Sequence, residues 1–310
     1  MSIYVQIATI EDNSITSTVE SAYENAAYPE DLYIGIAATV SDAFFKEKIM
    51  PLIKYPNVSI KRFDPNIHRG LGKGRVNSRF AYDDQDYILQ VDAHTLFEKN
   101  WDRFILKVLD KAIKETGNPK TLVTAYLGRY GNRGGKDTVL DNSTGYSLWP
   151  EKNVTNKVPL KGVKVTKIED FPDDALSDKS RVFYPSNRVA GNFIFGNREW
   201  ANYHGWSGEE TFWEEEILPA ISLLNNGFSL VFPNFPMPLT HKYYDEDPER
   251  QLMDEIFDRV DDINDLAISY IKKFVSENWE ACEKYRDYAG YDLATNTVTY
   301  KVYVPDKYGF

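Results

Sequence analysis

Short hydrophobic runs alternate with amphipathic stretches through the first third of the chain. The runs predict β-strands at residues 3–8, 32–37, 58–63 and 87–91. Between them, residues 14–25 and 41–51 carry hydrophobic side chains at helical spacing. Strands that alternate with helices pair in parallel through right-handed crossovers. The pattern therefore predicts the first half of a Rossmann-like α/β domain.

The rest of the chain is less regular. Further helices are predicted over residues 101–115, 208–225 and 247–288. Further strands are predicted over residues 122–127, 189–195, 228–233 and 297–304. A long polar stretch from Asn132 to Pro150 is typical of a binding loop or a lid. We therefore expect an α/β fold with a mixed sheet flanked by helices, followed by a helical C-terminal extension.

The fourth hydrophobic run ends in an aspartate and a histidine, Asp92 and His94. Residues i and i+2 of a strand point to the same face, so these two side chains are expected side by side. Open α/β sheets bind ligands beyond the carboxyl ends of their strands, where this pair would lie. The pair therefore suggests two ligands of a divalent metal ion. The alternative is a surface aspartate and a capping histidine without chemistry.

A third metal ligand is suggested by His241, which follows the predicted strand 228–233. One carboxylate and two imidazoles, with open positions for substrate oxygens, suit Mn²⁺ or another divalent cation. Such an ion can bridge and neutralise a diphosphate.

A glycine-rich basic segment, residues 68–79, stands out from the acidic background of the chain. Within it, Arg75 and Arg79 are four residues apart, which would place them on one face of a helix. Guanidinium groups near a helix N-terminus are suited to holding phosphate. The alternative is that these side chains only solvate the helix.

A collinear set of motifs extends through much of the chain. The longest is Tyr87–Phe97 (YILQVDAHTLF), which is followed by Asn100-Trp101-Asp102. The other motifs lie at residues 7–12, 70–79, 189–195, 208–210, 240–244 and 285–293. The set resembles the GT-A fold N-acetylglucosaminyltransferases that modify hydroxyproline on a cytoplasmic polypeptide.

The resemblance implies a donor site for a UDP-sugar. Metal ligation by Asp92, His94 and His241 would hold Mn²⁺ against the diphosphate. The residues that would line the nucleotide pocket are Thr9, Asp12 and Arg75, with Arg79 beside them. Those that would approach the donor sugar are Gly191 and Asn192, and Glu209 and Glu210 would lie near the transferred sugar or the acceptor. The family usually has a second glycine where this chain has Asn192.

The resemblance also implies a reaction and a domain organisation. A hexosyl or pentosyl group would pass from the UDP-sugar to a polypeptide hydroxyl with retention of anomeric configuration. Residues 1–245 would form the GT-A domain, with a nucleotide-binding half (1–130) and an acceptor half (131–245). Residues 246–310 would form the helical extension with its terminal strand.

Composition limits the partners and the location. The net charge of -11, from 36 basic and 47 acidic residues, argues against a protein that coats nucleic acid or anionic membrane. No apolar run is long enough to span a bilayer, and no signal sequence is evident. We expect a cytoplasmic protein without a membrane partner. The abundance of Asn, Asp, Lys, Ile and Tyr is typical of AT-rich genomes, including viral ones. A viral protein of this kind would be expected in the cytoplasm of its host.

Two other functions stay open at this point. A viral enzyme could glycosylate a hydroxymethylated DNA base, with phosphates held by Lys152, Lys157, Lys161, Lys164 and Lys167. The extruded base could stack on an aromatic set, Phe183, Tyr184, Trp200, Tyr203 and Trp206. A non-catalytic nucleotide-sugar-binding module on the same fold is the other alternative. A NAD-dependent oxidoreductase is disfavoured because no dinucleotide fingerprint follows the first strand.

Overall fold

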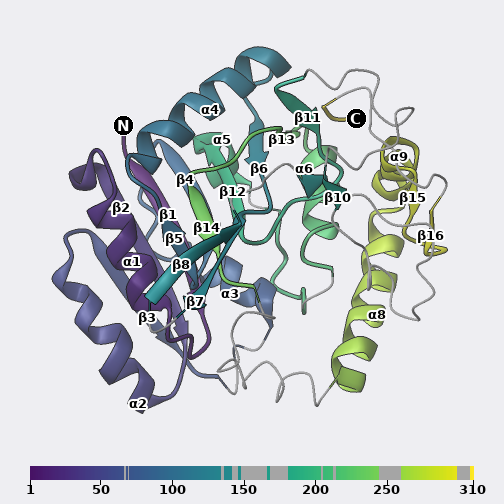
Figure 1. The fold of residues 1–310 in the computed structure, drawn as a ribbon. Coiled ribbons are helices and arrows are strands. Elements are labelled where there is room, and N and C mark those ends of the chain that lie inside the picture. The colour runs from purple at the N-terminus through teal and green to yellow at the C-terminus, as the bar shows by residue number, and fades with distance from the viewer. Residues whose placement is uncertain are drawn as a thin grey trace.

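An eight-stranded mixed sheet forms the centre of the molecule in a computed structural model (Figure 1). The structure describes residues 1–65, 68, 70–133, 136–141, 146–147, 166–167, 181–203, 205–211, 214–243, 260–298 and 308–310. The sheet has the strand order β11-β13-β6-β12-β4-β1-β2-β3. Its strands are β1 (Ile3–Thr9), β2 (Leu32–Thr39), β3 (Val58–Phe63), β4 (Tyr87–Asp92), β6 (Thr121–Thr124), β11 (Phe183–Pro185), β12 (Phe193–Asn197) and β13 (Ser229–Pro233).

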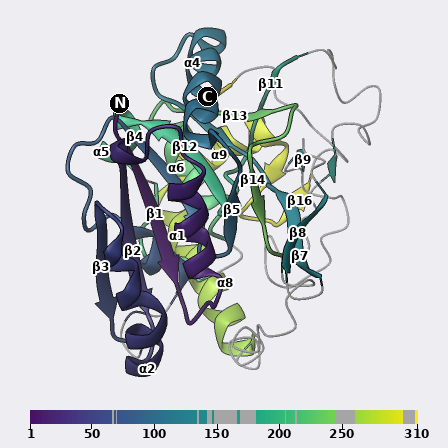
Figure 2. The ribbon, with the colours of Figure 1, turned by 60° about the vertical axis from the view of Figure 1, so that its left-hand side comes forward.

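Shorter strands form three smaller sheets. A four-stranded sheet has the order β5-β14-β7-β8, with β5 (Thr95–Phe97), β14 (Leu239–His241), β7 (Gly128–Arg133) and β8 (Lys136–Asp141). It lies beside the main sheet in Figure 2. The other two are pairs, β9 (Tyr146–Ser147) with β10 (Thr166–Lys167), and β15 (Tyr291–Asp292) with β16 (Thr297–Val298).

The described helices alternate with the strands in the first half and gather at the end of the chain. They are α1 (Ile15–Glu24), α2 (Asp42–Phe44), α3 (Leu71–Asn77), α4 (Trp101–Thr116), α5 (Arg198–Asn202), α6 (Leu218–Asn225), α8 (Val260–Glu277) and α9 (Trp279–Ala289). After α2 the chain continues as a π-helical turn, Phe45–Ile49, and a 3₁₀ segment, Met50–Lys54. The N-terminal elements and the C-terminal helices lie on opposite sides of the view in Figure 1.

The predicted α/β architecture is confirmed. Strands β1, β2, β3 and β4 pair in parallel, as the alternation of strands and helices predicts. Strand β12 runs antiparallel between β4 and β6, and so makes the sheet mixed. The predicted helical C-terminal extension is present as α8 and α9.

The period of two along the strands divides the core into two layers. Val5 of β1 and Leu89 of β4 face a cluster that contains the buried side of α1 and α4. Their neighbours Tyr4 and Ile88 face the opposite cluster, which contains α6 and α9. Alternate residues of a strand point to opposite faces, so a sheet covered on both sides needs hydrophobic residues at both positions. The C-terminal helix α9 is thus part of the second layer of the core.

Several predicted boundaries are wrong. The helix predicted from Gly208 to Asn225 begins only at Leu218, because Pro219 is tolerated in the first turn of a helix but not in its interior. The strand predicted over 189–195 begins at Phe193, and the one predicted over 122–127 ends at Thr124. Of the terminal strand predicted over 297–304, Thr297 and Val298 lie in β16 and the rest lies outside the described residues.

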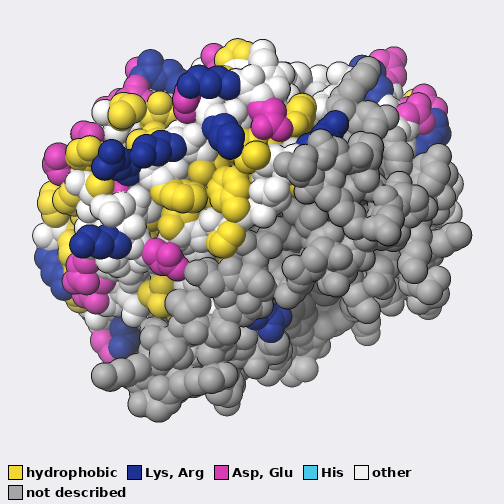
Figure 3. Space-filling view, turned by 45° about the horizontal axis from the view of Figure 1, so that its top comes forward, with side chains coloured by type: hydrophobic (Ala, Val, Ile, Leu, Met, Phe, Trp, Pro, Cys, Tyr) yellow, Lys and Arg dark blue, Asp and Glu magenta, His cyan; other side chains and the backbone are white. Residues whose placement is uncertain are grey.

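The described residues also bear on the predictions about membrane and nucleic-acid partners. No helix among them is both long enough and apolar enough to cross a bilayer. On the face shown in Figure 3, Lys and Arg side chains are interspersed with acidic and hydrophobic ones. Phe104 of α4 is 40% exposed and its ring lies 6.1 Å from that of Phe235.

Candidate active site

The turn that follows β4 carries Asp92 and His94 and is fixed by α1. Thr18 of α1 donates a hydrogen bond to the carbonyl of Ala93 (2.8 Å) and accepts one from the backbone N–H of Thr95 (3.0 Å). The hydroxyl of Thr95 donates to the carbonyl of Asp92 (3.0 Å). One buried threonine therefore holds both ends of the turn, and both side chains have a defined direction.

Pairing of β14 with β5 brings the distant His241 to this turn. The two strands are antiparallel, with His241 opposite Thr95. The backbone N–H of Lys242 donates to the carbonyl of His94 (3.0 Å). The register of this pair therefore decides the distance between the two histidines, whose ring centroids lie 4.5 Å apart.

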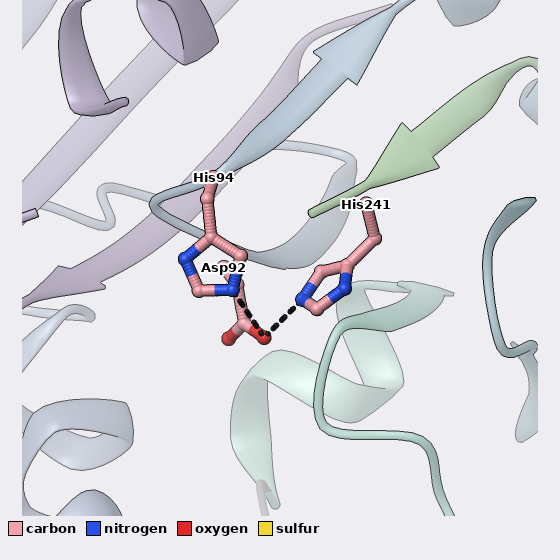
Figure 4. Close-up of side chains that lie close together, drawn as sticks. All are labelled: Asp92, His94 and His241. Atoms are coloured by element: carbon pink, nitrogen blue, oxygen red, sulfur yellow. Dashed lines mark hydrogen bonds and ion pairs between the residues drawn. The ribbon is translucent and has the colours of Figure 1, made fainter. Parts of the chain in front are cut away.

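The three residues predicted as metal ligands come together at the end of β4. One potential ligand atom from each of Asp92, His94 and His241 lies within 4.8 Å of the others. Both Nε2 atoms point to the same carboxylate oxygen, Asp92 Oδ2, at 3.8 Å for His94 and 3.0 Å for His241 (Figure 4). A carboxylate oxygen and two imidazole nitrogens that converge on one point form a donor set for a divalent cation.

Asp12 stands behind His94, on the side away from Asp92. Its Oδ2 lies 2.7 Å from Nδ1 of His94. A carboxylate on the far nitrogen fixes the orientation of an imidazole and leaves Nε2 to bind a metal. The structure thus places Asp12 where it orients a ligand; the predicted contact with the nucleotide stays a prediction.

Arg75 supports Asp92 from α3. Its guanidinium is buried and donates to Asp92 Oδ1 at 2.7 Å. Burial raises the pKa of Asp92. The Arg75 charge, the hydrogen bond with His241 and the electrostatic interaction with His94 lower it by more, so the pKa of Asp92 lies well below its usual value. Asp92 is therefore ionised, as a metal ligand must be.

Glu215 is a carboxylate at the site that the sequence analysis missed. Its Oε2 lies 3.6 Å from the Arg75 guanidinium. Burial raises its pKa to about 8, with Arg75 opposing this shift and Asp92 adding to it. The sequence did carry a signal for it, the triplet Glu214–Glu216 directly before a hydrophobic segment. Glutamates that are buried beside such a segment need charged or hydrogen-bonding partners, and these partners can form a polar site. The resemblance drew attention to the earlier pair, Glu209 and Glu210.

Glu216 belongs to a neighbouring polar group. It accepts hydrogen bonds from the hydroxyl of Tyr126 and from Arg188 (3.4 Å). Burial raises its pKa, and the Arg188 charge opposes this.

The turn at Gly191 and Asn192 is built against these groups. A Cβ atom on Gly191 would lie 2.7 Å from Glu215 Oε1, so a side chain at this position would displace that carboxylate. The carbonyl of Gly191 accepts a hydrogen bond from Gln90 (2.9 Å), and Gln90 in turn accepts one from Gln6 (2.7 Å). Gln90 lies two residues before Asp92 on β4, so one strand positions both the metal site and this turn.

The remaining nucleotide residues have different surroundings. Thr9 ends β1 at the same edge of the sheet as Asp92, and its buried hydroxyl has no hydrogen-bond partner among the described residues. Arg79 does not share a helical face with Arg75, because α3 ends at Asn77. Its guanidinium donates to the carbonyls of Trp200 (3.1 Å) and Ala201 (3.2 Å), so the structure gives no support to its predicted phosphate contact.

Glu209 and Glu210 lie outside any helix. Glu209 is exposed and pairs with Lys273 of α8 at 2.9 Å. Glu210 is buried and accepts from the backbone N–H groups of Ser207 and Gly208, both at 2.9 Å. No described contact joins either carboxylate to the three metal-site residues. Their catalytic role stays a prediction, and the helix that was predicted to begin at Gly208 does not include them.

The aromatic set considered for a flipped base is largely in the core. Four of its members, Phe183, Tyr184, Trp200 and Trp206, are at most 4% exposed. The fifth, Tyr203, is half-buried and stacks on Phe228 at 6.0 Å. Their predicted availability to a base is therefore wrong. The side chains of the five lysines, 152 to 167, lie outside the described residues.

Comparison with known families decides the class of the protein. A family model described as "Glycosyltransferase (GlcNAc)" matches residues 41–304. The chain belongs to this glycosyltransferase family. None of the curated proteins compared with it matches. The family model does not single out the hydroxyproline-modifying enzymes of the resemblance, so membership of that group stays a prediction.

Solved structures show the fold of this glycosyltransferase. GalNAc-T7 with UDP, GalNAc and Mn²⁺ aligns with a TM-score of 0.58 and 16% identity, over 78% of this chain and 44% of that chain. TarS of S. aureus aligns with a TM-score of 0.46 and 12% identity, over 78% and 60% of the two chains. The match thus spans 44% of the GalNAc-T7 chain, 60% of the 1–349 portion of TarS and 37% of the longer TarS chain. The predicted GT-A type of mixed sheet is confirmed by the likeness to GalNAc-T7.

Proposed function

We propose that this glycosyltransferase depends on a divalent metal and transfers a sugar from a UDP-sugar to a hydroxyl of a macromolecule. The observation that carries the proposal is the convergence of both histidine Nε2 atoms on Asp92 Oδ2, at the carboxyl end of β4. In open α/β sheets this edge is where ligands bind. The UDP and Mn²⁺ of the GalNAc-T7 structure support the same classes of donor and metal here.

The donor set fits a divalent cation such as Mn²⁺. Asp92 supplies an ionised oxygen, and both imidazoles present Nε2 to it. Asp12 holds His94 from behind, as the outer partners of metal-binding histidines do. A cation bound here would neutralise the diphosphate and stabilise UDP as a leaving group.

The surrounding residues would set the charge of the donor site. Arg75 donates a hydrogen bond to Asp92 Oδ1 and lies 3.6 Å from Glu215 Oε2, so its part is to keep Asp92 ionised and in place. Burial raises the pKa of Glu215 to about 8, and in its protonated form this carboxyl group can donate a hydrogen bond to a sugar oxygen. Positioned charges and hydrogen bonds of this kind are the main means by which proteins stabilise a charged transition state.

A polypeptide hydroxyl is the acceptor we propose, with retention of configuration. Both rest on the resemblance to the hydroxyproline-modifying enzymes, as does a cytoplasmic location. The DNA-base alternative is weakened by the burial of the aromatic side chains on which it depended. The sugar transferred, hexosyl or pentosyl, is left to experiment.

The proposal is tested by UDP release from a panel of UDP-sugars, with Mn²⁺ and with excess chelator. We expect one donor to be hydrolysed and the chelator to abolish the reaction. Asp92→Asn should lose activity by at least about a hundredfold, because a ligand and its charge are removed together. Asp110→Asn, on the exposed side of α4, is the matched control and should match wild type. Release that survives both the chelator and Asp92→Asn would refute the assigned metal site, and UDP binding without release would favour the binding module.

A further inference from the structure

Asn192 has a side-chain amide whose orientation is fixed by its neighbours. The residue is 5% exposed, and its amide nitrogen lies 3.3 Å from the hydroxyl of Tyr243. That hydroxyl donates its hydrogen to the carbonyl of Leu127 at 2.8 Å. A hydroxyl has a single hydrogen to donate, so it can only accept from Asn192. The amide NH₂ group therefore faces Tyr243, and Oδ1 points elsewhere.

The Oδ1 atom is buried and has no hydrogen-bond partner among the described residues. Buried polar atoms in folded proteins are nearly always paired, and an unpaired one is destabilising. Such an atom can accept a hydrogen bond from a ligand that reaches it.

The neighbours of Asn192 connect it to the metal site on two sides. The ring of Tyr243 packs on that of His241, with centroids 4.4 Å apart. On the other side, Gly191 lies against Glu215, and Gln90 of β4 holds its carbonyl. The unpaired oxygen is thus anchored to the strand and the turn that carry the proposed metal ligands.

We propose that Asn192 Oδ1 is a specificity determinant for the donor sugar. It accepts a hydrogen bond from an O–H or N–H group of the sugar, and donors without that group react more slowly. This inference rests on the proposed function and deepens it, because it names the chemical feature by which the donor is selected.

The experiment measures kcat/KM for UDP-glucose, its 2-, 3-, 4- and 6-deoxy analogues, and UDP-GlcNAc. Wild type should discriminate by about tenfold against the analogue that lacks the recognised group, the usual effect of one buried hydrogen bond. Asn192→Leu, of similar size without an acceptor, should bring that ratio close to one and leave the other ratios unchanged. Asn192→Asp keeps an acceptor oxygen and should retain the ratio. If Asn192→Leu changes only the kcat/KM ratio of UDP-GlcNAc to UDP-glucose, the recognised group is the acetamido N–H. If it changes only the ratio for one deoxy analogue, the recognised group is the hydroxyl that this analogue lacks.

The inference is overturned if Asn192→Leu keeps every wild-type ratio, or if wild type itself does not discriminate. Asn192→Ala serves in the same way if the leucine variant does not fold, as judged by thermal melting. A wild-type protein that releases no UDP from any donor overturns the proposed function itself. The two failures are therefore distinguishable.

Discussion

Asp92 and His94 illustrate how the site depends on residues that do not themselves face a ligand. Arg75 neutralises Asp92 from one side, and Asp12 orients His94 from the other. Both supports are charge-assisted hydrogen bonds of 2.7 Å, which are stronger than neutral ones. Each of these two candidate ligands is therefore held from behind, and the affinity of the proposed metal site should respond to changes at the supporting residues.

Asp12→Asn should weaken the affinity for Mn²⁺ by about tenfold to a hundredfold, the usual effect of losing the outer partner of a metal-binding histidine. The amide keeps the size of the side chain but loses the charge that fixes His94. Calorimetric titration with Mn²⁺ measures the change, and Asp110→Asn is again the control. Unchanged Mn²⁺ affinity in the Asp12 variant would contradict an orienting role.

Glu215→Gln should flatten the pH dependence of stability. The pKa of Glu215 rises from 4.5 to about 8 on folding, mainly through burial. Between these values the folded state holds a proton that the unfolded state has lost. The free energy of unfolding therefore falls as pH rises through this window, by up to about 1.4 kcal/mol per pH unit.

Glutamine does not titrate, so the variant lacks this slope. Denaturant titrations of metal-free wild type and variant, at intervals from pH 5 to pH 8, give the difference in unfolding free energy. As pH rises, the unfolding free energy of wild type should fall relative to that of Glu215→Gln. Parallel curves would mean that Glu215 titrates normally in the folded protein.

At the scale of elements, the site is assembled from five segments of the chain. Strand β4 supplies Asp92, the β4–β5 turn supplies His94, and β14 supplies His241. Glu215 lies three residues before the start of α6, and the Gly191 turn precedes β12. Because β12 lies next to β4, the Gly191 turn and the Asp92 turn are positioned by one pair of strands.

Gly191→Ala should lower kcat by about tenfold to a hundredfold, the range expected for a small misplacement of groups at a reaction centre. The added Cβ would lie 2.7 Å from Glu215 Oε1, so the carboxylate must move. UDP-release kinetics measure the effect, and circular dichroism checks the fold.

Gly117→Ala separates loss of stability from loss of activity. Gly117 ends α4 with a φ of +66°, and a Cβ atom added there would meet no other atom within 4 Å. Alanine at this position should cost about 1 kcal/mol of stability but leave kcat unchanged. Normal kcat in Gly191→Ala would contradict the close packing of Glu215 against that turn.

At the scale of the whole molecule, the C-terminal helix α9 supports the site from the second layer of the core. The hydroxyl of Tyr285 donates to the carbonyl of Asn187 (2.6 Å), and that of Tyr288 to the carbonyl of Ser186 (3.2 Å). Arg188, which follows Ser186 and Asn187 in the chain, forms an ion pair with Glu216. The predicted domain boundary at residue 245 lies outside the described residues, and α9 shares a core with α6.

Tyr285→Phe should lower the free energy of unfolding by about 1–3 kcal/mol, because the buried carbonyl of Asn187 loses its partner. Chemical denaturation measures the loss. Tyr28→Phe is the matched control, since Tyr28 is 46% exposed, and should change stability little. Equal stability of the two variants would show that α9 is not coupled to the 186–188 segment in this way.

The sequence by itself determined the elements and part of the site. Periods of two and 3.6 residues are local properties, so strands such as β1 and β4 and helices such as α1 and α4 could be predicted within a residue or two. Asp92 and His94 do lie close together as predicted, but not as two residues of one strand: β4 ends at Asp92, and the turn that carries His94 is held by Thr18 of α1.

Only the tertiary structure decided what depends on contacts distant in sequence. The register of β14 against β5 sets the place of His241, and the burial of Glu215 beside Arg75 raises its pKa. The hydrogen bond from Tyr243 to Leu127 fixes the Asn192 amide. Hydrophobic periodicity carries no information on such pairings, because it records which side of an element is buried and not which residue lies opposite.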